Sequence, residues 1–282
     1  MTGVLTGVTA FRLRKKYFID IRDIFSETIS DLFSRKNRML GSATKLIFSK
    51  LEKRLLRGAA GVNVVSEGFP CYFNKNGIDV SRWSFFPNGV DPEFVGFKSE
   101  RGNSPTENKT ILYAGNIGSG QGLETVIPKL AKQLGDKFQF VVVGDGGAAK
   151  LLKNGIEKEG INNVEMVLPV SRTELINYYH KADILFLHLN DMPAFRRVLP
   201  SKIFEYAALG KPIVAGLSGY SAKFLKEHVP YATLFELGDF NGAYKAIMQA
   251  SDTTVGSNSV DQFVKKYSRE SIMDKMAKHI LK

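Results

Sequence analysis

The sequence has 282 residues, 44% of them hydrophobic and 24% charged, which is typical of a folded globular protein and excludes a disordered chain. A single cysteine, Cys71, excludes an internal disulfide framework, and the four scattered histidines offer no cluster of metal ligands. No segment approaches the ~20 apolar residues of a bilayer-spanning helix, and the N-terminus lacks the features of a signal peptide, so the expected location is the cytoplasm.

Residues 1–98 are expected to form a partial N-terminal domain. The pattern predicts a helix over 2–16, a strand over 17–21, a long basic helix over 43–57, and strands over 62–65 and 83–86. Three strands are too few for a complete Rossmann-like sheet, so we expect the first strands of this domain to be missing. The polar stretch 99–109, with Gly102 and Pro105, is expected to link this part to the next one.

From residue 107 to residue 258, short apolar segments alternate with amphipathic ones. The predicted strands cover 111–113, 138–143, 164–168, 184–189, 213–215 and 234–236. Helices are predicted over 123–134, from after 147 to about 158, and over 171–180, 201–209, 222–226 and 239–250. Ser171 and Glu174 form a capping box at the start of one helix, and Gly210 ends another. This alternation predicts an α/β fold with a parallel, doubly wound sheet that binds ligands beyond the carboxyl ends of its strands. A final helix, about 260–281 within the segment 259–282, is expected to pack back toward the N-terminal domain.

A glycine-rich segment, Gly-Asn-Ile-Gly-Ser-Gly-Gln-Gly over 115–122, follows the first predicted strand of this domain and precedes a helix. Small residues allow backbone N–H groups to approach an anion, and the N-terminus of the helix adds its dipole, so the segment is a candidate cradle for a diphosphate. The alternative is an ordinary glycine-rich turn, and the spacing matches neither the Walker pattern nor the dinucleotide fingerprint. The candidate ligand-binding residues of this segment and of two further strand-end loops are Gly115, Asn116, Gly118, Gln121, Gly122, Gly144, Gly146 and Val170.

The segment Leu-Pro-Ser-Lys-Ile-Phe-Glu-Tyr over 199–206 opens another predicted helix. Its apolar residues form a stripe that is expected to be buried, whereas Ser201, Lys202 and Glu205 share the opposite face. The helix dipole disfavours a cation in the first turn unless an anion lies there, which favours Lys202 as a phosphate ligand. Glu205 is suited to accept hydrogen bonds from two ribose hydroxyls. The alternative for both residues is a surface ion pair between them.

Together these segments resemble the C-terminal domain of family 4 glycosyltransferases, which have the two-domain GT-B fold. The resemblance rests on the segments 87–91, 114–124, 142–146, 182–184 and 199–215, and the N-terminal part is similar only to the second half of the family's acceptor domain. The branch that the sequence resembles contains bacterial transferases that move N-acetylated amino sugars or related hexoses onto lipid-linked O-antigen and capsule precursors. The resemblance implies a retaining hexosyltransferase that uses a nucleoside-diphosphate sugar, with UDP the expected nucleotide, and needs no metal or other cofactor.

The sequence departs from the family's pattern at two places. Asn116 and Gln121 stand where many relatives have Arg and Lys, which leaves Lys202 as the candidate catalytic cation on the diphosphate. Arg197 stands where the family often has a glutamate that contacts the donor sugar, so Arg197 is expected either to face phosphate or to be a solvated loop charge.

Three further residues are candidates for the site. The segment 17–23 resembles a strand that in this branch has an Arg-Asp pair near the acceptor, which makes Arg22 and Asp23 candidate catalytic residues. The alternative for this pair is a salt bridge at the end of a strand. His188, at the end of a predicted strand, is expected either to contact the donor or to be a histidine with a purely structural role.

The net charge of +11 is concentrated at the N-terminus, where residues 1–57 contain 13 Lys or Arg against 5 Asp or Glu. The basic helix over 43–57 also has apolar residues at helical spacing, which favours anionic lipid on the inner face of the cytoplasmic membrane over nucleic acid. The alternative is an ordinary helix with a solvated face. The expected partners are therefore a nucleoside-diphosphate sugar, a glycan or polyprenyl-linked acceptor and this membrane surface, and not a nucleic acid.

Two other functions remain open from the sequence. The short N-terminal part is also compatible with an inactive or truncated nucleotide-sugar-binding module, and it leads us to expect that the chain binds a donor but transfers sugar poorly. A nucleotide-sugar epimerase of the GT-B fold is the other alternative, and the Pro-Ser-Lys helix argues against it.

Overall fold

The computed structural model describes residues 2–24, 38–97 and 108–281, and it describes the side chains within these ranges except for those of 2–4, 11 and 38–45. The chain divides into two compact units. Unit 1 contains Met1–Asn88, Arg197–Leu199 and Arg269–Lys282, and unit 2 contains Gly89–Arg196 and Pro200–Ser268. The domain ranges expected from the sequence, 1–98, 107–258 and 259–282, remain predictions, and residues 98–107 lie outside the described part.

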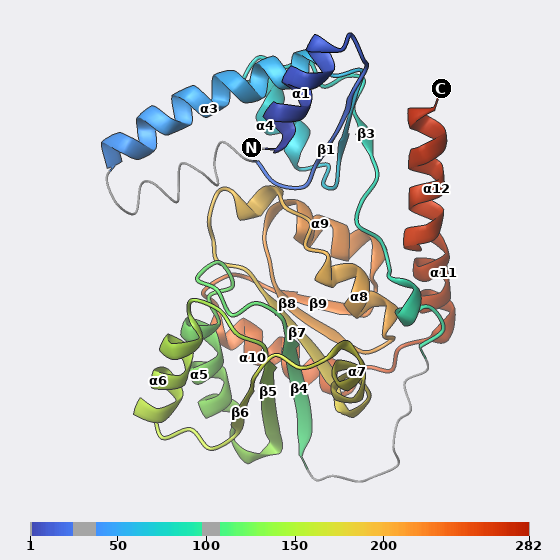
Figure 1. The fold of residues 1–282 in the computed structure, drawn as a ribbon. Coiled ribbons are helices and arrows are strands. Elements are labelled where there is room, and N and C mark those ends of the chain that lie inside the picture. Colours follow the sequence, from blue (N-terminus) through green and yellow to red (C-terminus); the bar gives the residue numbers. More distant parts are fainter. Residues whose placement is uncertain (1, 25–37, 98–107, 282) are drawn as a thin grey trace. The chain divides into compact units, whose positions relative to one another are not determined.

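Unit 1 is built around a small parallel sheet with the strand order β1-β2-β3 (Figure 1). Its elements are α1 (Thr2–Arg12), β1 (Phe18–Ile21), α3 (Arg38–Gly58), β2 (Gly61–Val64), α4 (Phe69–Lys75), β3 (Ser84–Phe85) and α12 (Arg269–Ile280). Apolar residues of β1 and β2 pack with Leu56 of α3 and with Phe69 and Phe73 of α4, because residues four apart lie on one face of a helix. The described part of unit 1 therefore contains the three strands that the sequence predicts.

Unit 2 contains a parallel six-stranded sheet with the order β6-β5-β4-β7-β8-β9. The strands are β4 (Lys109–Ala114), β5 (Phe138–Val143), β6 (Val164–Val167), β7 (Ile184–His188), β8 (Ile213–Gly216) and β9 (Ala232–Phe235). From β4 the sheet extends through β5 to β6 on one side and through β7 and β8 to β9 on the other. The strand order therefore reverses between β4 and β7. At such a switch point the loops that follow the two strands diverge and leave room for a ligand.

Helices cover both faces of this sheet (Figure 1). They are α5 (Leu123–Leu134), α6 (Ala149–Lys158), α7 (Arg172–Lys181), α8 (Lys202–Ala208), α9 (Gly219–His228), α10 (Phe240–Ser251) and α11 (Ser257–Tyr267), with short 3-10 turns at Pro92–Phe94, Gly135–Lys137 and Phe195–Arg197. Buried residues of α5, α6 and α10 pack against one face, and rings of α8, α9 and α11 pack together, including Phe204, Phe224 and Tyr267. The predicted doubly wound sheet is confirmed.

Local signals in the sequence have the predicted structural effects. Ser171 caps α7 in a full capping box, with its side chain accepting from the Glu174 N–H and the Glu174 side chain accepting from the Ser171 N–H. Gly210, two residues after the end of α8, has φ of 62°, and this left-handed conformation prevents the helix from continuing.

Two predictions of helices were wrong. The sequence analysis placed no helix at Phe69–Lys75, where α4 forms. The single helix predicted over about 260–281 is two helices, α11 and α12, because the chain becomes extended at Ser268, with ψ of 136°, and pairs there with Val90. This break lies at the point where the chain passes from unit 2 to unit 1.

Candidate functional site

The glycine loop, residues 115–122, lies directly against the loop that follows the neighbouring strand β5. Gly115 donates its N–H to the Val143 carbonyl at 2.9 Å, and Ile117 donates to the Asp145 carbonyl at 2.8 Å. Gly144 has φ of 144°, and a Cβ there would overlap the Gly115 carbonyl oxygen. A Cβ on Gly146 would lie 2.6 Å from the Asn116 Oδ1 atom. The two loops therefore pack backbone to backbone, which requires glycine at these positions.

Asn116 and Gln121 bond to each other within the glycine loop. The Asn116 amide donates to Gln121 Oε1 at 3.2 Å, and the Gly118 N–H donates to the same oxygen at 3.1 Å. These residues thus support the shape of the loop. Their predicted contact with a donor diphosphate remains a prediction.

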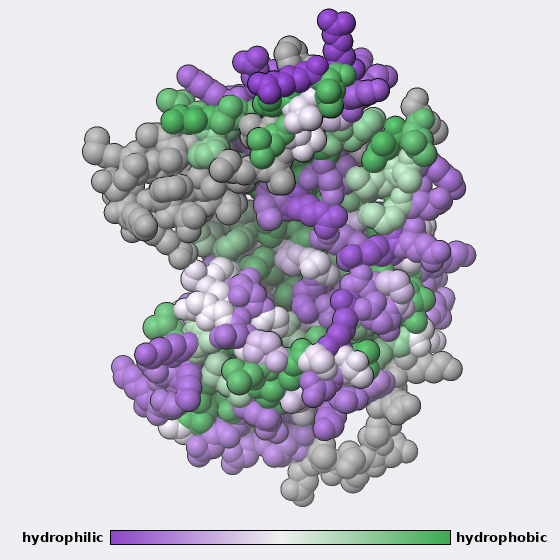
Figure 2. All heavy atoms as spheres, in the orientation of Figure 1, coloured by the Kyte–Doolittle hydropathy of each residue, from purple (hydrophilic) through white to green (hydrophobic). Residues whose placement is uncertain are grey.

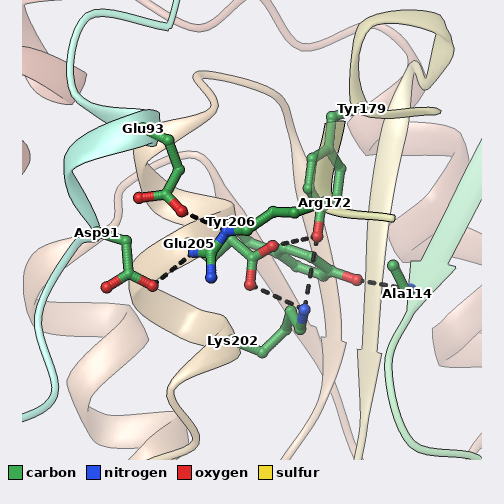
Figure 3. A network of polar contacts seen from close by, with 8 residues as sticks. All are labelled: Asp91, Glu93, Ala114, Arg172, Tyr179, Lys202, Glu205 and Tyr206. Carbon is green, nitrogen blue, oxygen red and sulfur yellow. Dashed lines mark hydrogen bonds and ion pairs between the residues drawn. The ribbon is translucent and has the colours of Figure 1, made fainter. Parts of the chain in front are cut away.

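Lys202 and Glu205 form an ion pair at the start of α8. Lys202 Nζ lies 2.8 Å from Glu205 Oε2, and the two side chains are only 23% and 19% exposed. The Tyr179 hydroxyl of α7 donates to the other carboxylate oxygen, so the Glu205 carboxylate lies between a hydroxyl and an ammonium group (Figure 3). Burial, and then the neighbouring Tyr206 and Glu205, raise the pKa of Tyr179, which keeps its hydroxyl protonated as a donor. The ion pair that the sequence analysis gave as the alternative is thus present, with both side chains partly buried.

The fold brings Lys202 to the glycine loop. A Cβ on Gly115 would lie 3.8 Å from Lys202 Cε. The fully buried Tyr206 fixes this approach, because its hydroxyl accepts a hydrogen bond of 3.0 Å from the N–H of Ala114, the last residue of β4 (Figure 3). The two segments that the sequence analysis selected independently, 115–122 and 199–206, therefore meet at the carboxyl end of β4.

A second charged cluster lies beside this pair, and the sequence analysis did not select it. Arg172 Nη2 lies 2.7 Å from Asp91 Oδ2, and its Nε forms an ion pair with Glu93 (Figure 3). The hydrogen bond to Asp91 is the largest of the effects that raise the pKa of Arg172. The guanidinium lies over the ring of Phe94, and that ring contacts Tyr179 edge-on at 6.0 Å between centroids.

The sequence contained one signal of this cluster. Asp91 belongs to the Pro-Asn-Gly-Val-Asp segment that supported the family resemblance, although no role was assigned to it there. Val170, a predicted donor-binding residue, is half-buried in the loop between β6 and α7, two residues before Arg172. Its contact with a donor remains a prediction.

Three predicted site residues belong to unit 1. Arg22 donates to Asp20 at 3.0 Å and to the Asn88 side chain at 3.2 Å, so it forms an ion pair at a strand end. Asp23 is exposed next to it, and partial desolvation raises the pKa of its carboxyl. The Arg197 carbonyl accepts from Ser66 at 2.5 Å, and its guanidinium lies 4.9 Å from the ring centre of Tyr72.

The remaining predicted residues have modest contacts. Ser201 precedes α8, is exposed, and makes no side-chain capping bond. Gly122 precedes α5 with φ of 62° and Gly118 lies in the loop close to the Asn116 and Gln121 side chains. His188 is 3% exposed, and its Nδ1 lies 2.6 Å from the Gln121 carbonyl oxygen. Burial lowers the pKa of His188, so the neutral ring is favoured.

Within the described ranges, no three His, Cys, Asp or Glu side chains are grouped closely enough to hold a metal ion. Among the same residues, no helix has the length and apolar character that crossing a membrane requires. The expectation of metal-independent binding remains a prediction.

Comparisons with known proteins identify relatives of both the sequence and the fold. Residues 96–266 match the family model described as "Glycosyl transferases group 1". The chain is 27% identical over 173 residues to the "Putative colanic acid biosynthesis glycosyl transferase WcaI" of Escherichia coli strain K12, covering 61% of this chain and 40% of the relative. It is 28% identical over 144 residues to an uncharacterized glycosyltransferase of Haemophilus influenzae, covering 50% of this chain and 39% of the relative. The chain thus matches about two fifths of the length of these curated relatives.

Solved structures share the fold. The crystal structure of Anabaena Alr3699/HepE in complex with UDP has a TM-score of 0.76 at 20% identity, covering 99% of this chain and 75% of that one. Sucrose-phosphate synthase from Thermosynechococcus elongatus has a TM-score of 0.73 at 18% identity, covering 98% of this chain and 71% of that one. The predicted α/β fold of the GT-B type is confirmed.

Proposed function

The chain belongs to the group 1 family of glycosyl transferases, and from this premise we propose that unit 2 binds a nucleoside-diphosphate sugar as donor. The proposed nucleotide is UDP, and the proposed transferred sugar is a hexose or an N-acetylated amino sugar. The acceptor is a glycan, linked to a polyprenyl lipid, in the synthesis of a surface polysaccharide. The transfer proceeds with retention of the anomeric configuration and without a metal.

One observation carries this proposal. The partly buried Lys202–Glu205 pair lies at the glycine loop, with Lys202 Cε close to Gly115. A cation beside a loop of small residues at the carboxyl end of β4 is suited to a diphosphate, because ammonium and backbone N–H groups both donate to phosphate oxygens. Glu205 accepts from Lys202 and Tyr179 and retains lone pairs for the ribose hydroxyls.

The proposed step is a substitution at C1 of the sugar with retention of configuration. The bond between C1 of the sugar and the diphosphate oxygen breaks, and its electron pair leaves with the diphosphate. An acceptor hydroxyl bonds to C1 from the same face, and its proton passes to the leaving phosphate oxygen. Lys202 and the loop N–H groups stabilise the charge that develops on the diphosphate, which is the largest contribution that a preorganised site of this kind makes.

The printed names of two relatives support the finer points. The Escherichia coli relative is named for colanic acid biosynthesis, which supports a surface polysaccharide as the product. The Anabaena protein of similar fold was solved with UDP, which supports UDP as the nucleotide.

Calorimetry with UDP and with uridine, in the presence of a chelator, tests this proposal. Lys202→Ala should weaken UDP binding about 10- to 100-fold, since a hydrogen bond to a charged group contributes ~1.5–3 kcal/mol, and should affect uridine much less. Lys223→Ala, which removes an exposed cation of α9, is the matched control and should change neither ligand. No binding of UDP by the unaltered protein at millimolar concentration would refute the proposal, and equal losses of UDP and uridine would refute the role of Lys202.

For the partner at the membrane we propose an anionic phospholipid surface, docked by a groove in unit 1. The groove lies between α1 and α3, has a volume of about 770 Å³, and is lined by apolar side chains and by the four cations Arg12, Arg14, Lys15 and Arg54. Leu5 and Val8 of α1 and Ile47 of α3 are 48–65% exposed nearby, and hydrophobic and hydrophilic side chains alternate over the top of the view in Figure 2. A protein surface that combines apolar side chains with flanking cations is typical of segments that lie in the headgroup layer of a membrane.

Sedimentation with vesicles tests the docking surface. The protein should bind vesicles that contain phosphatidylglycerol, and the triple variant Arg12→Gln, Arg14→Gln, Lys15→Gln should lose most of this binding. The corresponding triple change Lys150→Gln, Lys153→Gln, Lys158→Gln on α6 is the control and should retain it. Equal binding to neutral phosphatidylcholine vesicles would contradict the role of the cations.

A further inference from the structure

Three successive carbonyl groups of the glycine loop are bonded by the chain at the end of β7. The Ser119 carbonyl accepts from the Asn190 side-chain amide at 2.5 Å, and the Gly120 carbonyl accepts from the Asn190 backbone N–H at 2.9 Å. The Gln121 carbonyl accepts from His188 Nδ1 at 2.6 Å. All three contacts come from a segment 70 or so residues away in the sequence, on the strand next to β4 in the sheet.

These bonds fix the direction of the loop's N–H groups. The carbonyl and the N–H of one trans peptide unit point in opposite directions. Holding the carbonyls of Ser119, Gly120 and Gln121 toward β7 therefore turns the following N–H groups away from β7. The N–H of Gln121 closes a turn onto the Gly118 carbonyl at 3.0 Å. The N–H groups of Gly120 and Gly122 thus also point away from β7.

We propose that His188 and Asn190 are positioning residues of the donor site: they hold the glycine loop by its carbonyls so that the N–H groups of Gly120 and Gly122 meet the diphosphate. This inference rests on the proposed function, since it assigns the ligand of the loop to the diphosphate of the donor. Neither residue touches the reacting atoms in this role.

The surroundings of His188 favour a neutral imidazole that makes one hydrogen bond. The imidazole is buried beside the rings of Phe186 and Phe235, with centroids at 6.4 and 6.0 Å and nearly parallel planes, and the two phenyl rings lie 6.1 Å from each other. Because the partner atom is a carbonyl oxygen, Nδ1 must carry the proton. Within the described residues, Nε2 is buried and has no hydrogen-bond partner. Burying such a polar ring costs free energy. The hydrogen bond from Nδ1 to the Gln121 carbonyl offsets part of this cost.

The shape of the loop depends on the same segment. A Cβ on Gly120 would lie 2.7 Å from the ring of Phe195, and a Cβ on Gly122 would overlap the Asn190 side chain. Asp191 and Arg196 form a two-point ion pair, with both N–O distances 2.9 Å, which closes the segment that follows β7. Asn190 and Phe195 therefore lie directly against the glycine loop at Gly122 and Gly120.

Four variants, with UDP and uridine as probes, test the inference by calorimetry. His188→Leu removes the donor to Gln121 and should weaken UDP binding about tenfold, the effect of one hydrogen bond, while uridine binding stays within about twofold. His188→Asn places an amide N–H where Nδ1 was and should restore UDP binding to within about threefold. Asn190→Ala, at a more exposed position, should also weaken UDP selectively. His279→Leu in unit 1 is the control and should change neither ligand.

Amide resonances provide a second readout that does not depend on the variants' stability. In the unaltered protein, addition of UDP should shift the N–H signals of Gly120 and Gly122 downfield, and uridine should leave them nearly unchanged. If UDP binds but these signals do not move, or if His188→Leu and His188→Asn both bind UDP like the unaltered protein, the positioning role is overturned while the proposed function stands. If the unaltered protein binds no UDP, the proposed function fails and the inference fails with it.

Discussion

Units 1 and 2 differ in how well they support the side chains at the ends of their strands. In unit 2, β4, β5, β7 and β8 are buried nearly throughout. Lys202 and Glu205 bond to the buried Tyr179 of α7, and His188 is the last residue of β7. In unit 1, β1 has four residues, its Phe18 is 41% exposed, and the exposed residues Arg22 and Asp23 follow its last residue, the buried Ile21. Rigid support of polar groups favours a binding site, and the side chains at the strand ends of unit 2 have more of this support than those of unit 1.

The largest expected difference between the units comes from one matched substitution in each sheet. Phe186→Ala in β7 removes a fully buried ring and should cost ~3–5 kcal/mol, whereas Phe18→Ala in β1 should cost less than ~1 kcal/mol because the ring is partly exposed. Urea unfolding followed by hydrogen exchange of amides in β2 and β5 measures the two effects separately. Comparable losses of stability in both units would show that the two sheets are equally well packed.

A smaller effect is expected on ligand binding from changes in carboxylates. Glu205→Gln should weaken UDP and uridine alike, by ~1.5–3 kcal/mol, because the ribose that Glu205 is proposed to bind is common to both. Asp23→Asn in unit 1 is the matched change and should leave both affinities unaltered. Calorimetry on the two variants measures this, and a loss confined to UDP would move Glu205 from the ribose to the phosphate.

A pH dependence should distinguish the buried histidine of unit 2. The pKa of His188 is lowered by burial, so below about pH 6.5 the unfolded chain binds a proton that the folded chain does not. The free energy of unfolding should therefore fall as the pH falls below 6.5, by up to ~1.4 kcal/mol per pH unit, until the pH reaches the folded pKa of His188. His188→Asn should remove this slope and His279→Asn in unit 1 should not. Denaturant titrations between pH 5 and pH 8 measure it, and identical slopes in all three proteins would disprove it.

The smallest effect concerns helix ends in unit 2. Ser171→Ala removes the capping box of α7 and should destabilise the protein by ~1 kcal/mol. Ser218→Ala is a matched control, because Ser218 also precedes a helix but makes no side-chain capping bond. Thermal unfolding should show a lower Tm for Ser171→Ala than for Ser218→Ala. The same Tm for both would show that the cap contributes nothing and that packing alone supports α7.

Much of unit 2 follows from its sequence, for physical reasons. The predicted bounds of α5 and β5 agree with Leu123–Leu134 and Phe138–Val143, because a long amphipathic period and a continuous apolar run are the strongest patterns of their kinds. In unit 1, α4 has seven residues and only two buried side chains, which is too short a window for periodicity. The split between α11 and α12 does leave a trace, because the buried residues Phe263, Tyr267 and Ile272 change from a spacing of four to one of five.

The candidate site was predictable only in part. Lys202 and Glu205 are three apart on one helix, and their pairing follows from helix geometry. Tyr179 and Arg172 lie on another helix, and their partners Glu205 and Asp91 are 26 and 81 residues away. Contacts at such separations depend on how helices pack on the sheet, which no local pattern records. For the same reason the sequence leaves the role of His188 open between a donor contact and a structural histidine, since its bond to Gln121 joins residues 67 apart.

The division of the chain also affects the order in which the ribosome releases the two units. Unit 2 ends at Ser268, whereas unit 1 includes Arg269–Lys282, and α12 lines a pocket with β1 and β2 through Met276, His279 and Ile280. Synthesis is vectorial, at roughly 5–20 residues per second, so the segments of unit 1 up to Asn88 leave the ribosome before unit 2, and α12 leaves it after unit 2. Unit 2 is therefore expected to complete its sheet before unit 1 acquires α12.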